Sequence, residues 1–424
     1  MKNFFVSLGL AAAGTASLHA AYAPDSQDNS KMWSLSATLR GFYDDNYLAT
    51  PQKHGSAGFE VSPSFKLNVP LQQTEIGLRY TYGLYYYQQR EHNGQSPIDQ
   101  THQLDLWLDH AFTSSWEARV QDSVSVSQDP LLTSVGTATP QRINGNNVAN
   151  TVNALLHTDW TRQFSTALTY DNSFYDYENS GGTAANPSYA GLLNRVEQTI
   201  GLDFEWHIST TTTALIGYKF GLVNFTGNEQ IAQNTTIPTM PFYYSNSRDN
   251  WSQYGYLGVQ HALLDNLKAV ANVGVQYTEY YNDPSGQSSL GPYADASLIY
   301  TYASGSYAQL GVTETRNATD TVQVNSQGQI TLDQESTVVY ASINHPLTPE
   351  LLASLVGHYQ YSIYHNGQFD SQSAQYYSAG FNLSYAFNRH FSSDIGYNFD
   401  WYTTPVPGQG YTRNRVYMGV TATY

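Results

Sequence analysis

Apolar and polar residues alternate along nearly the whole chain, most regularly in its last stretch, from Arg413 to Tyr424. A two-residue period places successive side chains on opposite faces of a β-strand. One face of this strand is apolar, and the sequence ends with no later residue to cover it. A barrel whose outer face meets lipid needs no such cover, so the pattern favours a membrane barrel over a soluble sheet. The apolar positions are Val416, Met418, Val420, Ala422 and Tyr424.

Seventeen earlier segments show similar alternation, each of about ten residues, the length that a tilted strand needs to cross the hydrocarbon layer. Pro63 lies inside the second segment and predicts a bulge or a weak place in the ladder. Asp122 falls in the apolar phase of the fifth, which predicts either a bulge or a position near a membrane interface. The segments are 33–40, 59–67, 76–84, 104–112, 116–126, 148–160, 165–176, 194–207, 212–225, 251–263, 267–281, 291–302, 307–316, 336–345, 350–364, 374–387 and 391–402.

The links between these segments alternate in length, which predicts an all-β fold: a transmembrane antiparallel up-and-down β-barrel of about 18 strands. A soluble sandwich has no reason to place every long link at one end. In bacterial outer-membrane barrels the short turns face the periplasm and the long loops face outward, so both termini should be periplasmic. Short links lie at 70–74, 113–115, 161–164, 208–211, 264–266, 303–306, 346–349 and 388–390, and long ones at 44–56, 88–100, 127–147, 177–193, 226–250, 282–290, 317–335, 365–373 and 403–412.

Aromatic residues gather at both ends of the predicted strands, as expected for two girdles at the membrane interfaces. At the short-turn ends they include Trp33, Phe112, Trp116, Trp160, Phe164, Trp206, Tyr307, Phe387, Phe391 and Tyr424. At the long-loop ends they include Tyr43, Tyr86, Tyr175, Trp251, Tyr280, Tyr293, Tyr364, Tyr377 and Trp401.

The N-terminus predicts export. Residues 1–23 have a basic start at Lys2, a short apolar run and a small-residue cleavage site, which is typical of a signal peptide. Residues 24–31 are expected to be a short periplasmic segment, and residues 32–424 the barrel. After residue 23 the sequence contains no run of about 18 apolar residues, so no membrane helix is predicted. The absence of cysteine suits an oxidising compartment. We therefore expect the outer membrane of a Gram-negative-type bacterium.

Composition narrows the possible partners. The chain has 34 acidic and 18 basic residues, a formal net charge of −16, which disfavours nucleic acid. Its mean hydropathy of −0.43 is not informative, because barrels hide their membrane signal by alternation. The expected partners are membrane lipid and small hydrophilic solutes or glycans. The terminal aromatic resembles the signal that hands barrels to their insertion machinery.

A ring of eighteen strands encloses a water-filled lumen. The residues that alternate with the apolar ones along each strand should therefore face inward and line the pore. Alternatively, these charges pair across strands and only hold the wall. Inward aromatics such as Tyr85, Trp107 and Tyr417 either stack on sugar rings or fill the wall. The loop 128–147, with Asp129 and Arg142, is a candidate constriction. The pore-lining candidates are Arg40, Glu60, Lys66, Arg79, Asp105, Asp109, Glu117, Arg119, Arg195, Glu197, Asp203, Glu205 and Lys219.

The favoured function is a porin-like channel for hydrophilic solutes, including polysaccharide or oligosaccharide. A surface adhesin or receptor that binds through the loops 226–250 and 317–335 is the alternative. A hydrolase at the barrel rim is a third hypothesis, although the sequence has no catalytic or nucleotide-binding motif. The scattered histidines predict no metal site, and no cofactor is expected. The sequence leaves the solute and the oligomeric state open.

The residues Gly41 to Asn46, followed after a polar link by Val61, Ser62 and Pro63, resemble the opening of the second putative beta-barrel porin family. That resemblance implies a bacterial outer-membrane barrel, and some members of the family accompany exopolysaccharide production. It carries no catalytic or binding residue over to this chain. Physically, Asp44, Asp45 and Asn46 can turn the chain through bonds from side chain to backbone. A calcium-binding role for the two carboxylates is the alternative.

Overall fold

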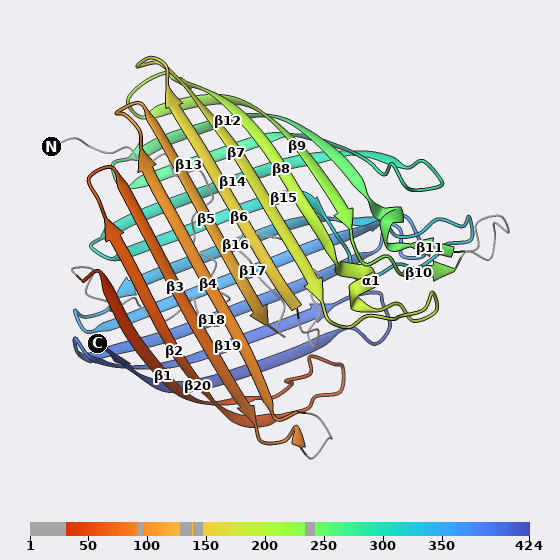
Figure 1. The fold of residues 1–424 in the computed structure, drawn as a ribbon, viewed down its shortest axis with the longest axis horizontal. Helices are drawn as coiled ribbons and strands as arrows, with labels where there is room; N and C mark the ends of the chain where they lie inside the picture. The colour runs from red at the N-terminus through yellow and green to blue at the C-terminus, as the bar shows by residue number, and fades with distance from the viewer. Residues whose placement is uncertain (1–30, 92–95, 128–137, 139–146, 234–241) are drawn as a thin grey trace.

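Eighteen antiparallel strands close into a single barrel (Figure 1). The structure is a computed structural model that describes residues 31–91, 96–127, 138, 147–233 and 242–424. β1 (Trp33–Asp44) pairs with β2 (Ser56–Pro70) on one side and with β20 (Tyr411–Thr423) on the other, which closes the ring. The other barrel strands are β3 (Thr74–Tyr87), β4 (Ile98–Ala111), β5 (Trp116–Ser127), β6 (Asn147–Asp159), β7 (Phe164–Tyr177), β8 (Arg195–His207), β9 (Thr212–Phe225), β12 (Asn250–Leu264), β13 (Leu267–Glu279), β14 (Ser288–Ala303), β15 (Ser306–Asn317), β16 (Asp333–Pro346), β17 (Leu351–His365), β18 (Ser373–Asn388) and β19 (Phe391–Thr403).

The predicted barrel and all eighteen of its strands are confirmed. The largest difference in bounds is at β4, which starts at Ile98, whereas the alternation indicated a start near Leu104. The reason is that Gln100 and His102 occupy the outward phase of β4 and interrupt the apolar pattern. Within the described residues, no helix is long and apolar enough to cross a membrane.

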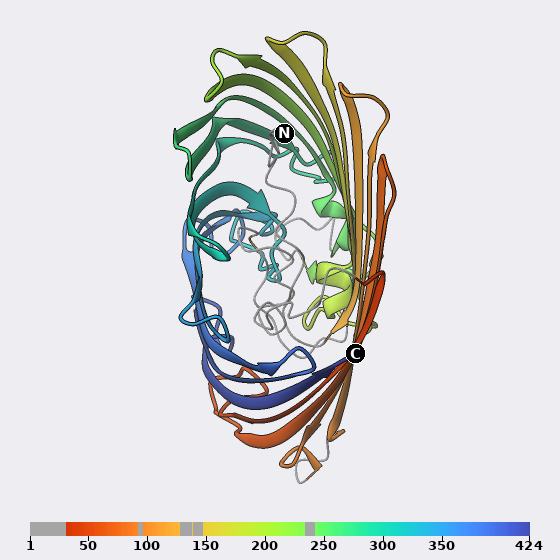
Figure 2. The ribbon, with the colours of Figure 1, turned by 90° about the vertical axis from the view of Figure 1, so that its left-hand side faces the viewer.

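The long and short connections lie at opposite ends of the barrel, as predicted. The C-terminus lies at the short-turn end (Figure 1). The long connections carry four further elements at the other end: helix α1 (Tyr189–Leu193), the hairpin β10 (Gln230–Gln233) and β11 (Phe242–Tyr244), and the 3₁₀ helix η2 (Ser245–Arg248). Viewed from the short-turn end, the ring is oval, and α1 projects within its outline (Figure 2).

The two faces of the wall differ as the alternation requires. Residues paired across antiparallel strands point to the same face. Most outward positions are apolar, and many are exposed, as at Met418 and Val420 in β20. Inward positions are polar, as at Ser252 in β12, whose hydroxyl contacts Thr278 in β13. The wall therefore presents apolar side chains outside and polar ones inside.

The two irregular positions behave differently. The ladder between β2 and β3 skips Ser62 and Pro63 and resumes at Ser64 without a change of register. There the Ser62 hydroxyl donates to the Tyr82 carbonyl at 3.1 Å. The ladder is thus weak at Pro63, but no bulge forms. At Asp122 the registers of β5 with both neighbours are continuous, so the expectation of a bulge there is wrong.

Four aromatics assigned to the long-loop girdle do not face outward. Tyr175, Tyr280, Tyr293 and Tyr364 are all buried, and Tyr364 is fully so. The alternation places Tyr293 on the inner face of β14, where it packs with Tyr256. Tyr175, Tyr293 and Tyr364 occupy the inward phase of their strands, and Tyr280 follows β13 and packs in a buried apolar cluster. Tyr43 and Trp401 do remain exposed on the outside.

Candidate channel lumen

The thirteen candidate lining residues all lie on the inward face of the wall. Their positions alternate with exposed apolar residues along each strand, and their paired neighbours are also inward. They are Arg40, Glu60, Lys66, Arg79, Asp105, Asp109, Glu117, Arg119, Arg195, Glu197, Asp203, Glu205 and Lys219. The constriction candidates Asp129 and Arg142 lie outside the described residues.

Many of these charges are engaged by neighbours on the wall. Arg79 contacts Asp105 on the next strand, with 2.9 Å between nitrogen and oxygen. Arg119 contacts both Asp109, at 3.4 Å, and Glu117. Such pairs hold these side chains against their neighbours on the wall.

Lys219 is the centre of an inward group on β9. Its ammonium donates to the Tyr293 hydroxyl at 3.1 Å and lies 5.4 Å from the ring centres of both Tyr256 and Tyr293. Tyr256 in turn donates to Asp203 at 2.5 Å. Asp171 and Asp295 also interact electrostatically with Lys219. One cation is therefore surrounded by three acidic groups at this part of the wall.

Inward aromatic rings lie over glycines of the adjacent strand. A β-carbon at Gly77 would lie 1.8 Å from Cε2 of Trp107, and one at Gly396 would lie 2.2 Å from Cζ of Tyr417. Because glycine has no side chain, each ring can lie against the wall rather than project into the lumen. This geometry supports the wall-filling interpretation of Trp107 and Tyr417.

The residues that carried the family resemblance close the ring at its long-loop end. The buried Asp44 carboxylate of β1 accepts from Arg413, at 2.6 Å, and from Arg415, at 3.0 Å, both on β20. Its other oxygen accepts from the Asn46 amide at 3.0 Å, so the expected turn is present. Two guanidinium groups thus already pair with the Asp44 carboxylate, which would have to bind the calcium ion in the alternative hypothesis.

Asp45 and Asn46 extend the same joint. Asp45 accepts from the backbone amide of Asn414 at 2.6 Å and from Lys53 at 2.6 Å. Asn46 donates to the carbonyls of Thr50 and Thr412, at 2.8 and 2.9 Å. Burial alone would raise the pKa of the Asp45 carboxyl, but the hydrogen bonds from Lys53 and Asn414 outweigh it and hold the pKa below its ordinary value. The aspartate pair and the asparagine therefore fasten the first strand to the last.

Three long connections pack together over the long-loop end, and we call this packed unit the cap. It comprises the described parts of 178–194, 226–249 and 318–332, together with Tyr280 at the start of the connection 280–287. Its centre is apolar and almost completely buried. The residues of that centre are Leu192, Leu193, Ile231, Ala232, Tyr243, Tyr280, Val322, Ile330 and Leu332.

Arg248 ties the three connections of the cap together. It is fully buried, stacks on the Phe225 ring at 4.1 Å, and donates to the carbonyls of Leu192 and Thr319, the latter at 2.9 Å. Burial, together with the nearby positive charge of Arg195, lowers its pKa. The guanidinium thus bridges a loop on each side of its own segment.

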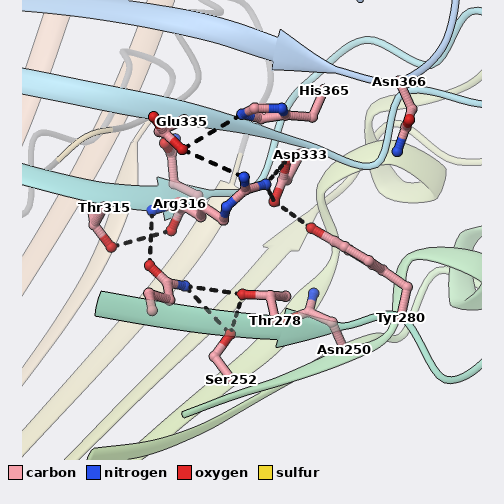
Figure 3. A network of polar contacts seen from close by, with 12 residues as sticks. Asn250, Ser252, Thr278, Tyr280, Thr315, Arg316, Asp333, Glu335, His365 and Asn366 are labelled. Carbon is pink, nitrogen blue, oxygen red and sulfur yellow. Dashed lines mark hydrogen bonds and ion pairs between the residues drawn. The ribbon is translucent and has the colours of Figure 1, made fainter. Parts of the chain in front are cut away.

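A second network anchors the cap to the wall (Figure 3). The ladder between β14 and β15 begins only at Ala294, paired with Glu314, although β14 already pairs with β13 from Ser288. Arg316 of β15 fills this region and contacts Asp333 of β16 at 3.0 Å. Tyr280, which also belongs to the cap, donates to Asp333. Side chains therefore replace the missing backbone ladder just beneath the cap.

Glu229 joins the α1 connection to the β10 connection. Its carboxylate accepts from the Gly181 and Gly182 amides at 2.9 and 3.0 Å and from the Ser188 hydroxyl at 2.5 Å. Burial acts to raise its pKa, but these hydrogen bonds outweigh burial, and the pKa of Glu229 lies below its ordinary value. The deprotonated carboxylate is thus the form that holds the two connections together.

One inward group resembles a hydrolase site in composition. The Ser165 hydroxyl lies 3.0 Å from Nε2 of His207 and 2.7 Å from Glu205, to which it donates. A serine that already donates to a carboxylate cannot give the same proton to the histidine. Ser165 is also only 2 % exposed. This cluster holds the wall near the short-turn end and lacks an accessible nucleophile. Among the described residues, no group of three or more potential ligands could hold a metal ion.

The alternation of apolar and polar residues does not predict the cap. The only available signals were short apolar stretches inside long polar links, such as residues 189–193 and 230–232. Neither stretch is long enough to predict burial without knowing which loops meet. The sequence indicated a constriction from a different loop, 128–147.

The family model described as Putative beta-barrel porin 2 matches residues 32–424. The chain belongs to this family. It is a channel-forming barrel of the outer membrane, so the short-turn end is periplasmic and the cap is extracellular. The family resemblance, the outer-membrane location and the channel function predicted from the sequence are confirmed.

Among solved structures, the chain is similar to Acinetobacter baumannii OccAB4, with 12 % identity over 93 % of this chain and 99 % of that one and a TM-score of 0.43. It is also similar to Pseudomonas aeruginosa OpdK with vanillate, at 8 % identity over 92 % and 99 % of the chains, with a TM-score of 0.44. For Pseudomonas aeruginosa OccK9 (OpdG) the identity is 8 % over 92 % and 98 %, with a TM-score of 0.45. Comparison with curated protein sequences finds no match.

Proposed function

We propose that this porin passes small hydrophilic solutes of the size of oligosaccharides, including fragments of polysaccharide, and that the extracellular cap limits their size. The observation that supports this most is the combination of an eighteen-stranded ring that has a polar inner face with a packed cap over one end. Solutes would enter beside the cap and then pass between inward charges that are paired along the wall.

The flat inward rings support the same proposal. Trp107 and Tyr417 lie over glycines of the adjacent strands, against the wall. The paired charges of the wall offer hydroxyl-rich solutes many donors and acceptors without a strong net field at one site. A solute with several hydroxyl groups can exchange water for these contacts at little cost.

We further propose how the chain is exported and inserted, and that it has no catalytic role. Residues 1–23 are a signal peptide that is removed on export, and residues 24–31 form a short periplasmic segment. The barrel insertion machinery reads the strand that ends at Tyr424. The protein has no enzymatic activity of its own.

The test is the conductance of the refolded mature chain in planar bilayers, with and without a series of maltooligosaccharides. A stable open channel whose current falls in the presence of the sugars is the expected result. A barrel that conducts no current, on cells that nevertheless bind a surface ligand through it, would instead favour the adhesin. A conducting channel that excludes even the smallest sugar would overturn the proposed solute class and leave the channel itself intact.

A further inference from the structure

Asp122 points outward from the middle of the membrane-facing wall. It pairs directly with Leu106 of β4 and Val152 of β6, and the Leu106 side chain is exposed on the outer surface. Paired residues share a face, and the registers here contain no bulge, so Asp122 faces the same way. A carboxylate on the lipid face is costly, and most so near the midplane.

The strand registers locate Asp122 in depth. Successive strand pairings connect one row of outward residues. Because the strands are tilted, this row rises from Trp33, the first residue of β1 at the periplasmic end, to Trp251, at the extracellular end of β12. Asp122 is the fifth of the ten residues in that row, so it lies near the middle of the hydrocarbon layer. The row is Trp33, Leu67, Leu78, Leu106, Asp122, Val152, Asn172, Gln198, Leu222 and Trp251.

Asp122 belongs to a patch of outward polar groups on four consecutive strands, β5 to β8. The patch consists of Asp122, Asn150, Asn172 and Gln198, and we call it the polar patch. Asn150 donates to Asp122 at 2.5 Å, and Gln198 donates to the Tyr170 hydroxyl at 3.2 Å. Asn172 has no side-chain hydrogen bond to any described residue. Four strands span about 14 Å at the usual strand spacing.

Glu314 on β15 is an instructive contrast. It also faces outward, and it accepts from Thr337. Its own row begins at Trp116, at the periplasmic end, and has already climbed through eight pairings when it reaches Glu314. Glu314 therefore lies close to the extracellular interface, where water satisfies a carboxylate. Asp122 has no such access.

The internal bonds leave the polar patch only partly satisfied. A carboxylate offers about four acceptor sites, and each side-chain amide offers two donors and an acceptor. In hydrocarbon no water supplies the missing partners, and unsatisfied polar groups are costly. Something other than lipid tails must therefore meet this part of the wall.

The chemistry of the patch selects the occupant. The outward face of β4 to β9 carries no lysine or arginine, so it offers nothing to the phosphates of lipid head groups. The patch combines an acceptor, Asp122, with amides that both donate and accept, so it is complementary to itself. Ala118 and Ala154 beside it are small and allow close approach. We propose that two copies of this porin meet in the membrane through the polar patch, about a two-fold axis.

The arrangement explains why the outward amides sit beside the carboxylate. Across the two-fold axis, each copy presents the same donors and acceptors of the polar patch to the other, so each copy gives and receives the same bonds. Residues that are costly in lipid become buried, hydrogen-bonded groups in the pair. This proposal does not depend on the identity of the solute.

Disulfide cross-linking in native membranes tests the proposal, because the chain has no cysteine of its own. Ala154→Cys places a thiol beside the polar patch, and Ala379→Cys places one at an exposed outward position of β18, on a distant part of the ring. Under a mild oxidant, Ala154→Cys should give a covalent dimer and Ala379→Cys should not. Equal cross-linking at both positions, or none at Ala154, would overturn the proposal.

A second pair of variants separates contact from stability. Adding Asp122→Leu to Ala154→Cys should reduce the cross-linked fraction at least tenfold, which is a loss of about 1.4 kcal/mol of association or more. Folding is monitored by the resistance of the barrel to unfolding in detergent. Asn150→Val is the alternative variant if Asp122→Leu does not fold. Unchanged cross-linking in a folded variant would show that the polar patch does not hold the copies together.

Discussion

The Asp44 carboxylate on the first strand lies 2.6 Å from the Arg413 guanidinium on the last, and neither side chain is exposed to solvent. The two residues are 369 positions apart, so this ion pair exists only once the ring has closed. Together with Arg40, which reaches across β20 to Asp394 on β19 at 2.8 Å, it fastens the seam at two heights. A barrel has no free edge only if this seam holds.

Replacing Asp44 should therefore weaken the whole barrel. Asp44→Asn leaves the buried Arg413 and Arg415 without their carboxylate, and breaking a buried ion pair in this way costs roughly 3–5 kcal/mol. The free energy of unfolding in lipid vesicles, measured by urea titration, should fall by this order. Asp45→Asn, whose side chain is partly exposed and carries a surface pair, is the control and should cost much less. Equal losses in the two variants would contradict the assigned role of Asp44.

Because Gly419 of β20 has no side chain, Arg40 can extend over it to reach Asp394 on β19. A β-carbon at position 419 would lie 2.3 Å from Cγ of Arg40 and 2.9 Å from the Leu39 carbonyl oxygen. Gly419→Val should thus lower the free energy of unfolding by about 1–3 kcal/mol, the usual cost of overpacking. Gly41→Val is the matched control, since a β-carbon at position 41 has no neighbour within 4 Å. Stability loss only in Gly419→Val is the expected result.

The cap should depend on Arg248. Arg248→Met removes two donated bonds, each worth roughly 1.5–3 kcal/mol when the donor is charged, while it keeps much of the side-chain volume. We expect single channels with a larger conductance and more frequent transitions, and barrel stability close to that of the unaltered protein. Arg389→Met, in an exposed turn at the periplasmic end, removes the same charge away from the cap. An effect of equal size in both variants would mean that charge alone, and not the cap, was responsible.

Acid should loosen the cap through Glu229. Because the folded pKa of Glu229 is lowered, its contribution is present above the unfolded value of about 4.3 and is lost as the pH falls through the folded pKa. Proteolytic cleavage within residues 178–188 should therefore increase below about pH 4, measured with an acid-stable protease. Glu229→Gln should show the faster cleavage at neutral pH and no further step on acidification. A step of the same size in that variant would assign the change to another group.

Lys219 should set part of the ion selectivity. It is the cation that faces Asp171, Asp203 and Asp295, so Lys219→Met leaves that part of the wall acidic. A unit charge about 8 Å from a permeating ion in water is worth about 0.5 kcal/mol, which corresponds to roughly a twofold rise in the ratio of cation to anion permeability. Reversal potentials across a salt gradient measure this ratio. Lys53→Met, in the first long connection, should leave it unchanged.

Much of the fold could be predicted from the sequence because the membrane imposes a simple rule on a barrel. Each strand must alternate apolar and polar residues, must be long enough to cross, and must be joined by turns of two distinct lengths. These are local properties, so the alternating segments and the two classes of link length along the chain were sufficient to indicate eighteen strands. The inward phase of Arg40, Asp203 and Lys219 followed from the same alternation.

What the sequence by itself determined is therefore the wall: the number of strands, the two faces and the two ends. Only the tertiary structure decided which residues meet, because those contacts join positions that no local pattern relates. The union of Asp44 with Arg413, the assembly of the cap around Arg248, and the depth of Asp122 all depend on ring closure and on the accumulated register of many strands. A two-residue period fixes the direction in which a side chain points, but the partner that it reaches is fixed only when the whole ring has formed.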